Sequence, residues 1–169
     1  MNKPTANRMQ HRPRTGGFTL VELSVTMVIA AILAAIAIPA YSNYVRKAHR
    51  TEAKSVLLDL ASLEERYYSA NNNYTAIASN LGYSGTGTTT AGGSFTVGSG
   101  YYTVVLGQTD PIAPTTALPG GTPATYSITA TAVNDQLKDT QCRSFQVTNN
   151  GAQTAADSAS AVNTNTCWH

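Results

Sequence analysis

Residues 18–40 read FTLVELSVTMVIAAILAAIAIPA, an apolar run that contains a single acid, Glu22. As an α-helix, which rises 1.5 Å per residue, this run extends for roughly 34 Å and exceeds the roughly 30 Å hydrocarbon core of a bilayer. The run is longer than the apolar core of a secretory signal peptide, which has about 7–15 residues, and no A-x-A cleavage pattern follows it closely. It therefore predicts a membrane-spanning helix.

The charges on either side of this run are unequal. Residues 1–17 carry Lys3, Arg8, Arg12 and Arg14 and no acid, whereas the chain from Phe18 onward has seven Lys and Arg against nine Asp and Glu. By the positive-inside rule, the basic segment stays in the cytoplasm and the C-terminal part lies outside. With 169 residues, of which 12% are charged and 42% hydrophobic, the chain has room for one compact domain, which excludes a large two-domain enzyme and a wholly disordered chain.

Glu22 is unusual inside an apolar run, because an acid at the centre of a membrane helix costs about 2.5–3.5 kcal/mol. One interpretation is that Glu22 lies at the cytoplasmic interface and stays hydrated. The other begins with Gly16 and Gly17, which offer an open backbone to a protease. Cleavage after Gly17 would leave Phe18 as a new N-terminus one helical turn from Glu22, and the amine of a neighbouring chain could then pair with the carboxylate.

The string GFTLVEL at residues 17–23, leading into an apolar segment that ends with Pro39, closely resembles the signature of type IV prepilins and of the related type II secretion pseudopilins. The resemblance implies that prepilin peptidase removes residues 1–17 between Gly17 and Phe18 and that the amine of Phe18 is methylated. It also implies that helices of residues 18–40 pack in a filament core, with Glu22 paired to a neighbouring N-terminus. The expected locations are the inner membrane before assembly, as a single-pass protein, and then an extracellular pilus; the expected partners are other pilins and the assembly machinery.

Three positions depart from the pilin pattern. Ser24 and Thr26 are more polar than the aliphatic residues often found there, and Ala31 replaces a common glycine. We expect the two hydroxyls to bond carbonyls one turn back, which keeps the helix compatible with lipid.

The helical pattern resumes after Pro39, a residue that normally breaks a helix interior. Apolar residues recur three or four positions apart beyond it, so the sequence predicts one helix from about Thr19 to Ala70, kinked near Pro39. Residues 18–40 form its apolar half. Residues 41–70 form an amphipathic half, in which we interpret Glu64 and Glu65 as solvated or salt-bridged charges. A basic cluster in this half is expected to lie near phosphate headgroups or to pair with acids on the helix; it consists of Arg46, Lys47, Arg50 and Lys54.

Residues 71–169 are expected to form the globular head. Residues 71–100 are interpreted as a variable loop, because residues 82–100 contain seven glycines. Strands are predicted at Tyr101–Leu106, Ala124–Val133 and Ser144–Thr148, followed by a hairpin turn at residues 149–151, and the proline-rich residues 110–123 are expected to be a loop. The prediction is an α+β pilin fold, in which a long kinked helix packs on an antiparallel sheet of three or four strands.

The two cysteines, Cys142 and Cys167, lie outside the cytoplasm in this topology, where disulfides persist. A bond between them would close a loop of about 26 residues and stabilise the fold by roughly 3–4 kcal/mol, whereas the alternative is two free thiols. In pilins, a disulfide at this place bounds a C-terminal loop of the head.

The sequence predicts no catalytic, cofactor or metal site. Only two histidines, His49 and His169, remain after removal of the leader, and neither belongs to a known catalytic or metal-binding motif. The leading hypothesis is a structural subunit of a type IV pilus, which would support adhesion, twitching motility or DNA uptake. The alternatives are a type II secretion pseudopilin, a minor pilin that binds DNA or a surface, and an enzyme anchored by one helix. Few basic residues follow Ala70, namely Lys138 and Arg143, and this argues against nucleic acid as a partner.

Overall fold

The computed structural model describes residues 17–84, 87–110 and 123–168. Residues 1–16 of the predicted leader and most of the proline-rich loop lie outside these ranges. The chain divides into two compact units, Met1–Tyr41 and Ser42–His169, and helix α1 contributes residues to both.

Helix α1 runs from Leu20 to Asn71, within one residue of both predicted ends. Pro39 lies inside the helix and does not end it. The prediction that the chain is helical on both sides of Pro39 is therefore confirmed, whereas the kink stays a prediction. After the helix, Asn72 adopts a left-handed backbone with φ of 54°, a conformation that asparagine tolerates better than most residues and that commonly stops a helix.

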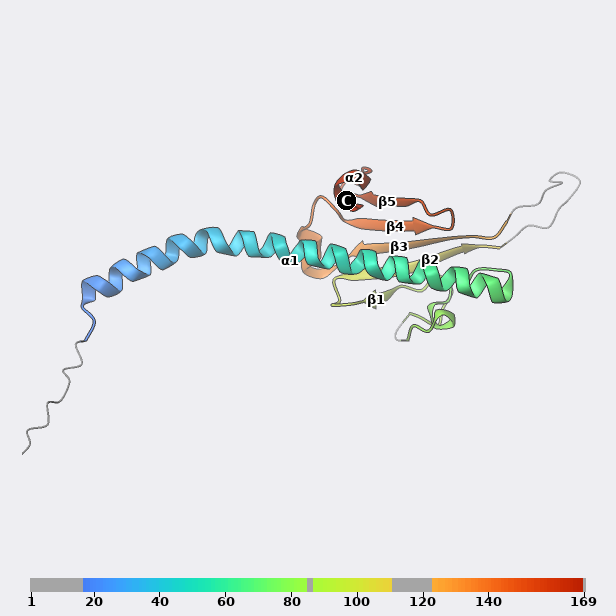
Figure 1. Cartoon of the computed structure of the whole chain (residues 1–169), viewed down its shortest axis with the longest axis horizontal. Helices are drawn as coiled ribbons and strands as arrows, with labels where there is room; N and C mark the ends of the chain where they lie inside the picture. Colours follow the sequence, from blue (N-terminus) through green and yellow to red (C-terminus); the bar gives the residue numbers. More distant parts are fainter. Residues whose placement is uncertain (1–16, 85–86, 111–122, 169) are drawn as a thin grey trace, which may run out of the picture. The chain divides into compact units, whose positions relative to one another are not determined.

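The sheet of the head is an antiparallel meander in which each strand pairs with the next along the chain, in the order β1-β2-β3-β4-β5 (Figure 1). Its strands are β1 (Phe95–Val97), β2 (Tyr102–Thr109), β3 (Thr125–Ala132), β4 (Ser144–Thr148) and β5 (Gln153–Ala156). Short helices complete the head: η1 (Ala78–Leu81), η2 (Asn134–Lys138) and α2 (Thr164–Trp168).

The sheet has five strands where the sequence predicted three or four. The three predicted strands are present as β2, β3 and β4, and the predicted turn joins β4 to β5, with Gly151 at a positive φ of 76°. β1 lies inside the expected variable loop, where Phe95 pairs with Val104 of β2. β5 is a short edge strand of sequence QTAA, held by its register with β4.

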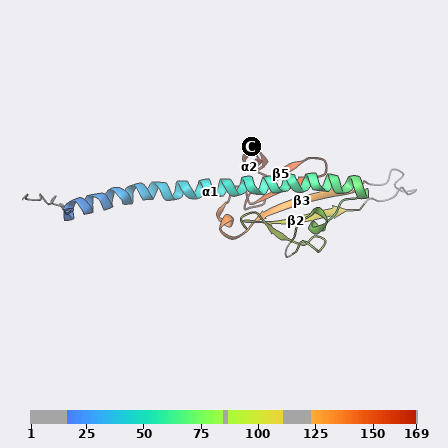
Figure 2. The ribbon, with the colours of Figure 1, turned by 60° about the horizontal axis from the view of Figure 1, so that its bottom comes forward.

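The core of the head lies between one face of the sheet and the second half of α1, which runs along that face (Figure 2). Leu57 and Leu60 of the helix are fully buried, as are Ile128 of β3 and Phe145 of β4. The alternation along β3 and β4 turns hydroxyl and amide side chains to the other face, which confirms the predicted alternation of β3. The helical stripe and the inner sheet face therefore bury each other.

Glu64 corrects the interpretation of the helix charges. It lies on the stripe with Leu57 and Leu60 and is 0% exposed, so it is not solvated, and among the described residues it forms no ion pair. Its neighbour Glu65 is exposed, as expected. Because positions 57, 60 and 64 are separated by three and four residues, the same periodicity that identified the stripe places Glu64 on it.

Candidate functional site

The predicted cleavage site lies in an open stretch before α1. Gly17 and Phe18 are exposed, and a Cβ added to Gly17 would meet nothing within 4 Å. Phe18 is 85% exposed. The fold of this chain therefore gives no internal reason for a glycine at position 17.

Thr19 caps the start of α1, a role that the sequence analysis missed. Its Oγ1 accepts a hydrogen bond of 3.2 Å from the backbone N–H of Glu22, and its carbonyl accepts one of 3.1 Å from Leu23. A Thr followed three residues later by Glu is the pattern of a capping box, so the signal was present in the sequence. The cap places Glu22 in the first turn, where the helix dipole favours a negative charge.

In the described structure, the side chains of the first half of α1 are exposed. Its large apolar side chains are more than half exposed, and the helix is long and apolar enough to cross a membrane. The hydroxyl groups of Ser24 and Thr26 donate to the carbonyls of Val21 and Leu23 at 2.8 and 2.9 Å, which confirms the expected bonds one turn back. Because so much apolar surface is unfavourable in water, this half requires lipid or other apolar helices around it.

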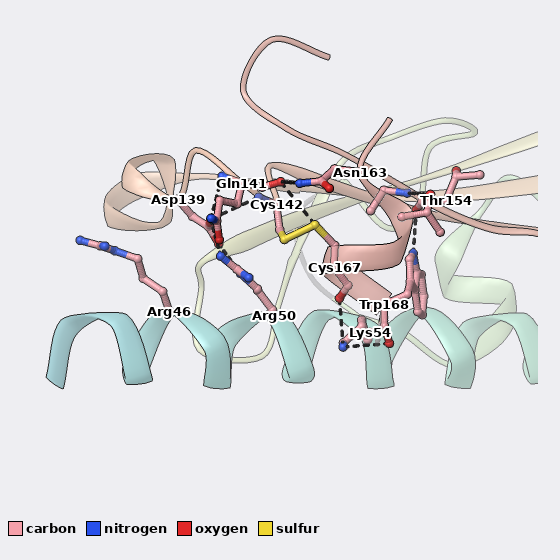
Figure 3. The surroundings of a disulfide bond; sticks show 12 residues. Arg46, Arg50, Lys54, Asp139, Gln141, Cys142, Thr154, Asn163, Cys167 and Trp168 are labelled. Atoms are coloured by element: carbon pink, nitrogen blue, oxygen red, sulfur yellow. Dashed lines mark hydrogen bonds and ion pairs between the residues drawn. A yellow bond between two sulfur atoms is a disulfide. The ribbon is translucent and has the colours of Figure 1, made fainter. Parts of the chain in front are cut away.

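The disulfide between Cys142 and Cys167 is confirmed, with both cysteines buried and their Cα atoms 5.7 Å apart. We call residues 142–167 the disulfide segment. Figure 3 shows its contact with α1, where the ammonium group of Lys54 donates to the carbonyl oxygens of Cys167 and Trp168 at 3.2 and 3.5 Å. At its other side the indole N–H of Trp168 donates to the carbonyl of Thr154 in β5 at 2.8 Å.

A buried carboxylate, Asp139, holds the start of this segment against α1. The guanidinium of Arg50 donates to both of its oxygens, at 2.5 and 2.7 Å, and the backbone N–H groups of Gln141 and Cys142 donate at 3.2 Å (Figure 3). Asp139 is 3% exposed, and Arg50 compensates its charge in that buried position. Periodicity gave no signal for this pair, because its two members are 89 residues apart in sequence.

Gln136 of η2 extends the polar contacts next to Asp139. Its amide nitrogen donates to Asp139 at 3.1 Å and to the hydroxyl of Tyr102 at 3.2 Å, and its oxygen lies 3.1 Å from Nδ1 of His49. His49 also stacks on Tyr101, with ring centroids 3.8 Å apart. His49 therefore has a packing role, and across the residues that the structure describes no group of three or more His, Cys, Asp or Glu could hold a metal ion.

Two family models match the chain. Residues 39–146, more than half of it, match the model described as "Type IV minor pilin ComP, DNA uptake sequence receptor". Residues 12–38 match the prokaryotic N-terminal methylation motif, which spans Gly17, Phe18 and Glu22.

Several known proteins with similar sequences are named as pilins or fimbrial proteins. The type IV major pilin protein PilA of Myxococcus xanthus is 37% identical over 71 residues, which cover 42% of this chain and 32% of that protein. Prepilin peptidase-dependent protein D of Escherichia coli is 64% identical over 36 residues, covering 21% of this chain and 25% of that protein, so this chain spans only a third or less of the length of these two relatives. Fimbrial protein Q of Moraxella bovis is 32% identical over 108 residues, which cover 54% of this chain and 69% of that protein.

This chain combines a long helix, whose apolar first half is exposed in the described structure, with an α+β head. The chain belongs to the type IV pilins, in the family that the first of the two models describes.

Proposed function

We propose that this chain is a structural subunit of a type IV pilus, made as a precursor. Prepilin peptidase cleaves between Gly17 and Phe18, the amine of Phe18 is methylated, and the subunit waits in the inner membrane with its head outside the cytoplasm. It then enters a filament with copies of itself and other pilins. The names of the relatives, which are pilins and fimbrial proteins, support a pilus over a secretion pseudopilus.

The observation that carries this proposal is the exposed apolar half of α1, which begins next to Glu22. A helix that is apolar on all sides is stable in lipid and equally stable among like helices, so the same surface serves both states. In the filament the carboxylate of Glu22 pairs with the methylated amine of Phe18 from a neighbouring subunit, which neutralises both charges before they are buried.

Substitution of Glu22 tests the assembly step. Glu22→Ala leaves the apolar helix and the cleavage site intact, so we expect a processed, membrane-bound subunit that is lost from filaments by tenfold or more. Mass spectrometry of sheared surface filaments and of the membrane fraction measures both amounts and the mature N-terminus. Glu65→Gln, which removes the charge of an exposed carboxylate but keeps an oxygen that can accept from the hydroxyl of Tyr74, is the matched control and should assemble normally.

Two results would contradict the proposal. One is normal incorporation of Glu22→Ala into filaments. The other is a wild-type chain that still begins at Met1 and is never recovered with copies of itself in fibres.

A receptor for DNA during uptake is a second candidate function, favoured by the description of the matching family model. The charges of the head weigh against it, because Lys138 pairs with Asp135 and Arg143 donates to the carbonyl of Leu137. Retardation of a DNA duplex by the purified full chain tests this function. Binding that falls steeply with salt and is lost in Lys138→Gln would support it.

A further inference from the structure

A groove with a surplus of positive charge lies between α1 and the segment that enters the disulfide. It has a volume of about 320 Å³ and is open to solvent. On the helix side it is lined by Asn43, Arg46 and Lys47, and on the other side by Lys138, Thr140 and Gln141; the ion pair of Arg50 with Asp139 also lines it. We call this site, with all eight residues, the basic groove.

Two cations of the basic groove, Arg46 and Lys47, are not paired with an acid among the described residues. Lys138 pairs with Asp135 at 2.6 Å, and the nearby Arg50 is held by Asp139. In the described part of the chain, by contrast, Arg46 and Lys47 form no ion pair. One guanidinium nitrogen of Arg46 donates to the side chain of Asn43 at 3.1 Å, which leaves its other donors available.

The acids near the groove are already compensated. Lys138, and more weakly Arg46, lowers the pKa of Asp135. The carboxylate of Asp139 accepts two bonds from Arg50. A second pocket of about 350 Å³, lined by Lys47 and Lys54, continues the positive surface along the helix. In Figure 3, Arg46, Arg50 and Lys54 rise from the same side of α1.

The position of the groove along the chain limits which anions it can meet. Arg46 is six residues beyond Ala40, where the apolar run ends, and six helical residues correspond to about 9 Å. The headgroup layer of one leaflet is about 5–8 Å thick. Because the long arms of Arg and Lys extend toward phosphates while their stems pack on the helix, Arg46 and Lys47 reach this layer from a subunit anchored in the membrane.

We propose that the basic groove binds the phosphate of an anionic phospholipid while the subunit waits in the membrane. The guanidinium of Arg46 and the ammonium of Lys47 donate to the two free oxygens of the phosphate diester. Asn43, Thr140 and Gln141 provide neutral partners for the hydroxyl groups of a glycerol headgroup. The inference rests on the proposed function, since it requires a membrane-anchored subunit.

Lipid fits this groove better than DNA. A protein that binds duplex DNA through its backbone contacts about 6–10 phosphates, whereas Arg46 and Lys47 suffice for one phosphate group. One phosphate with a small uncharged headgroup matches two adjacent cations.

Lipid binding to the full chain in nonionic detergent micelles tests the proposal. Native mass spectrometry compares titrations with phosphatidylglycerol and phosphatidylcholine, which share the phosphate but differ in the positive charge of choline. At about 1 kcal/mol per cation near anionic lipid, the two cations lead us to expect that the wild-type chain prefers phosphatidylglycerol about thirtyfold. The double variant Arg46→Gln and Lys47→Gln should lose that preference.

Arg66→Gln is the matched control for Lys47→Gln, because each removes one exposed charge from α1 and Arg66 lies outside the groove. The control should keep the wild-type preference, whereas Lys47→Gln should lower it about fivefold. Lys47→Gln should also fold normally, since in the described structure the side chain of Lys47 forms no hydrogen bond within the chain.

Several results would overturn the proposal. They are equal affinity for the two lipids, an equal loss in Arg66→Gln, displacement of the lipid by millimolar inorganic phosphate, and retardation of a DNA duplex that disappears in the double variant. If the chain is recovered from filaments but shows no lipid preference, the proposal of lipid binding fails and the proposed pilus function stands. If the chain is absent from filaments, the proposed function fails whatever the lipid result.

Discussion

Glu64 carries a fully buried carboxyl group on the inner side of α1. One of its oxygens accepts a bond of 3.0 Å from the backbone N–H of Thr75, and the other has no hydrogen-bond partner among the residues that the structure describes. Burial raises the pKa of Glu64 to about 7; the bond from Thr75 opposes the shift and the charge of Glu65 adds to it. Glu64 therefore gains its proton near neutral pH, unlike an exposed glutamate.

This residue makes the stability of the head depend on pH. The folded pKa of about 7 lies above the unfolded value of about 4.5, so the stabilising contribution is complete below pH 4.5 and is lost as the pH rises through 7. We expect the free energy of unfolding to fall by about 2 kcal/mol between pH 5 and pH 8. Denaturant unfolding at a series of pH values measures this slope.

Glu64→Gln separates this effect from other titrations. The amide keeps the shape and the bond from Thr75 but cannot ionise, so the slope between pH 5 and pH 8 should flatten. Glu65→Gln, one position away and exposed, should retain most of the slope. An unchanged slope in Glu64→Gln would refute the assignment.

At the scale of elements, α2 at the end of the disulfide segment contacts both β4 and α1. Trp168 in α2 packs on Phe145 of β4 with ring centroids 5.8 Å apart, and Lys54 of α1 holds the carbonyls of Cys167 and Trp168. Asp139 fixes the entry to the segment through Arg50. The segment therefore has contacts that remain when the covalent bond is removed.

Replacement of Cys142 and Cys167 by serine should lower the free energy of unfolding by about 3 kcal/mol, mainly because the unfolded chain regains the entropy of an open loop of about 26 residues. Denaturant unfolding of the double variant measures this loss. Hydrogen exchange should show faster exchange in β5 and α2, while β2 and β3 stay protected. A loss below about 0.5 kcal/mol, the range of ordinary surface substitutions, would contradict this account.

The sequence predicts the long elements and misses the short ones for physical reasons. Helix α1 and strand β3 repeat their apolar pattern over many residues, so a few polar substitutions do not hide them. β1 has three residues among glycines, and β5 has the sequence QTAA with low strand propensity. Both exist because a neighbouring strand offers free backbone groups, which is a tertiary effect.

The residues of the candidate site also divide into those with a local sequence signal and those that only the tertiary structure brings together. Gly17, Phe18 and Glu22 lie in a contiguous motif, so the sequence alone predicts their roles, and the cap by Thr19 also has a local sequence signal. The ion pair of Arg50 with Asp139 joins residues 89 positions apart, and nothing local marks either as a partner of the other. Glu64 lies on a stripe that was recognised, but its chemistry alone suggested exposure.

The whole molecule consists of two units with different requirements. Met1–Tyr41 buries no described side chain, while Ser42–His169 contains the entire hydrophobic core. Membrane or filament contacts are thus separate from the stability of the head.

A chain of residues 42–169 should therefore fold alone and dissolve without detergent. Its free energy of unfolding should agree with that of the full chain to within about 0.5 kcal/mol, followed by the fluorescence of Trp168. A chain that starts at residue 59 is the control; it lacks Ala53, Leu57 and Arg50 and should not fold. Precipitation or unfolding of the longer fragment would show that the apolar half contributes to the head.

The order of strands has a consequence for biogenesis. Each strand of the sheet pairs with its predecessor in the chain, so no strand must wait for a distant partner. Such short-range pairing speeds folding, and the helix that templates the core is the first part of the head to be synthesised. In the proposed topology, strands that emerge one after another outside the cytoplasm can pair in that same order, and Cys167 meets Cys142 only after β4 and β5 have been translocated.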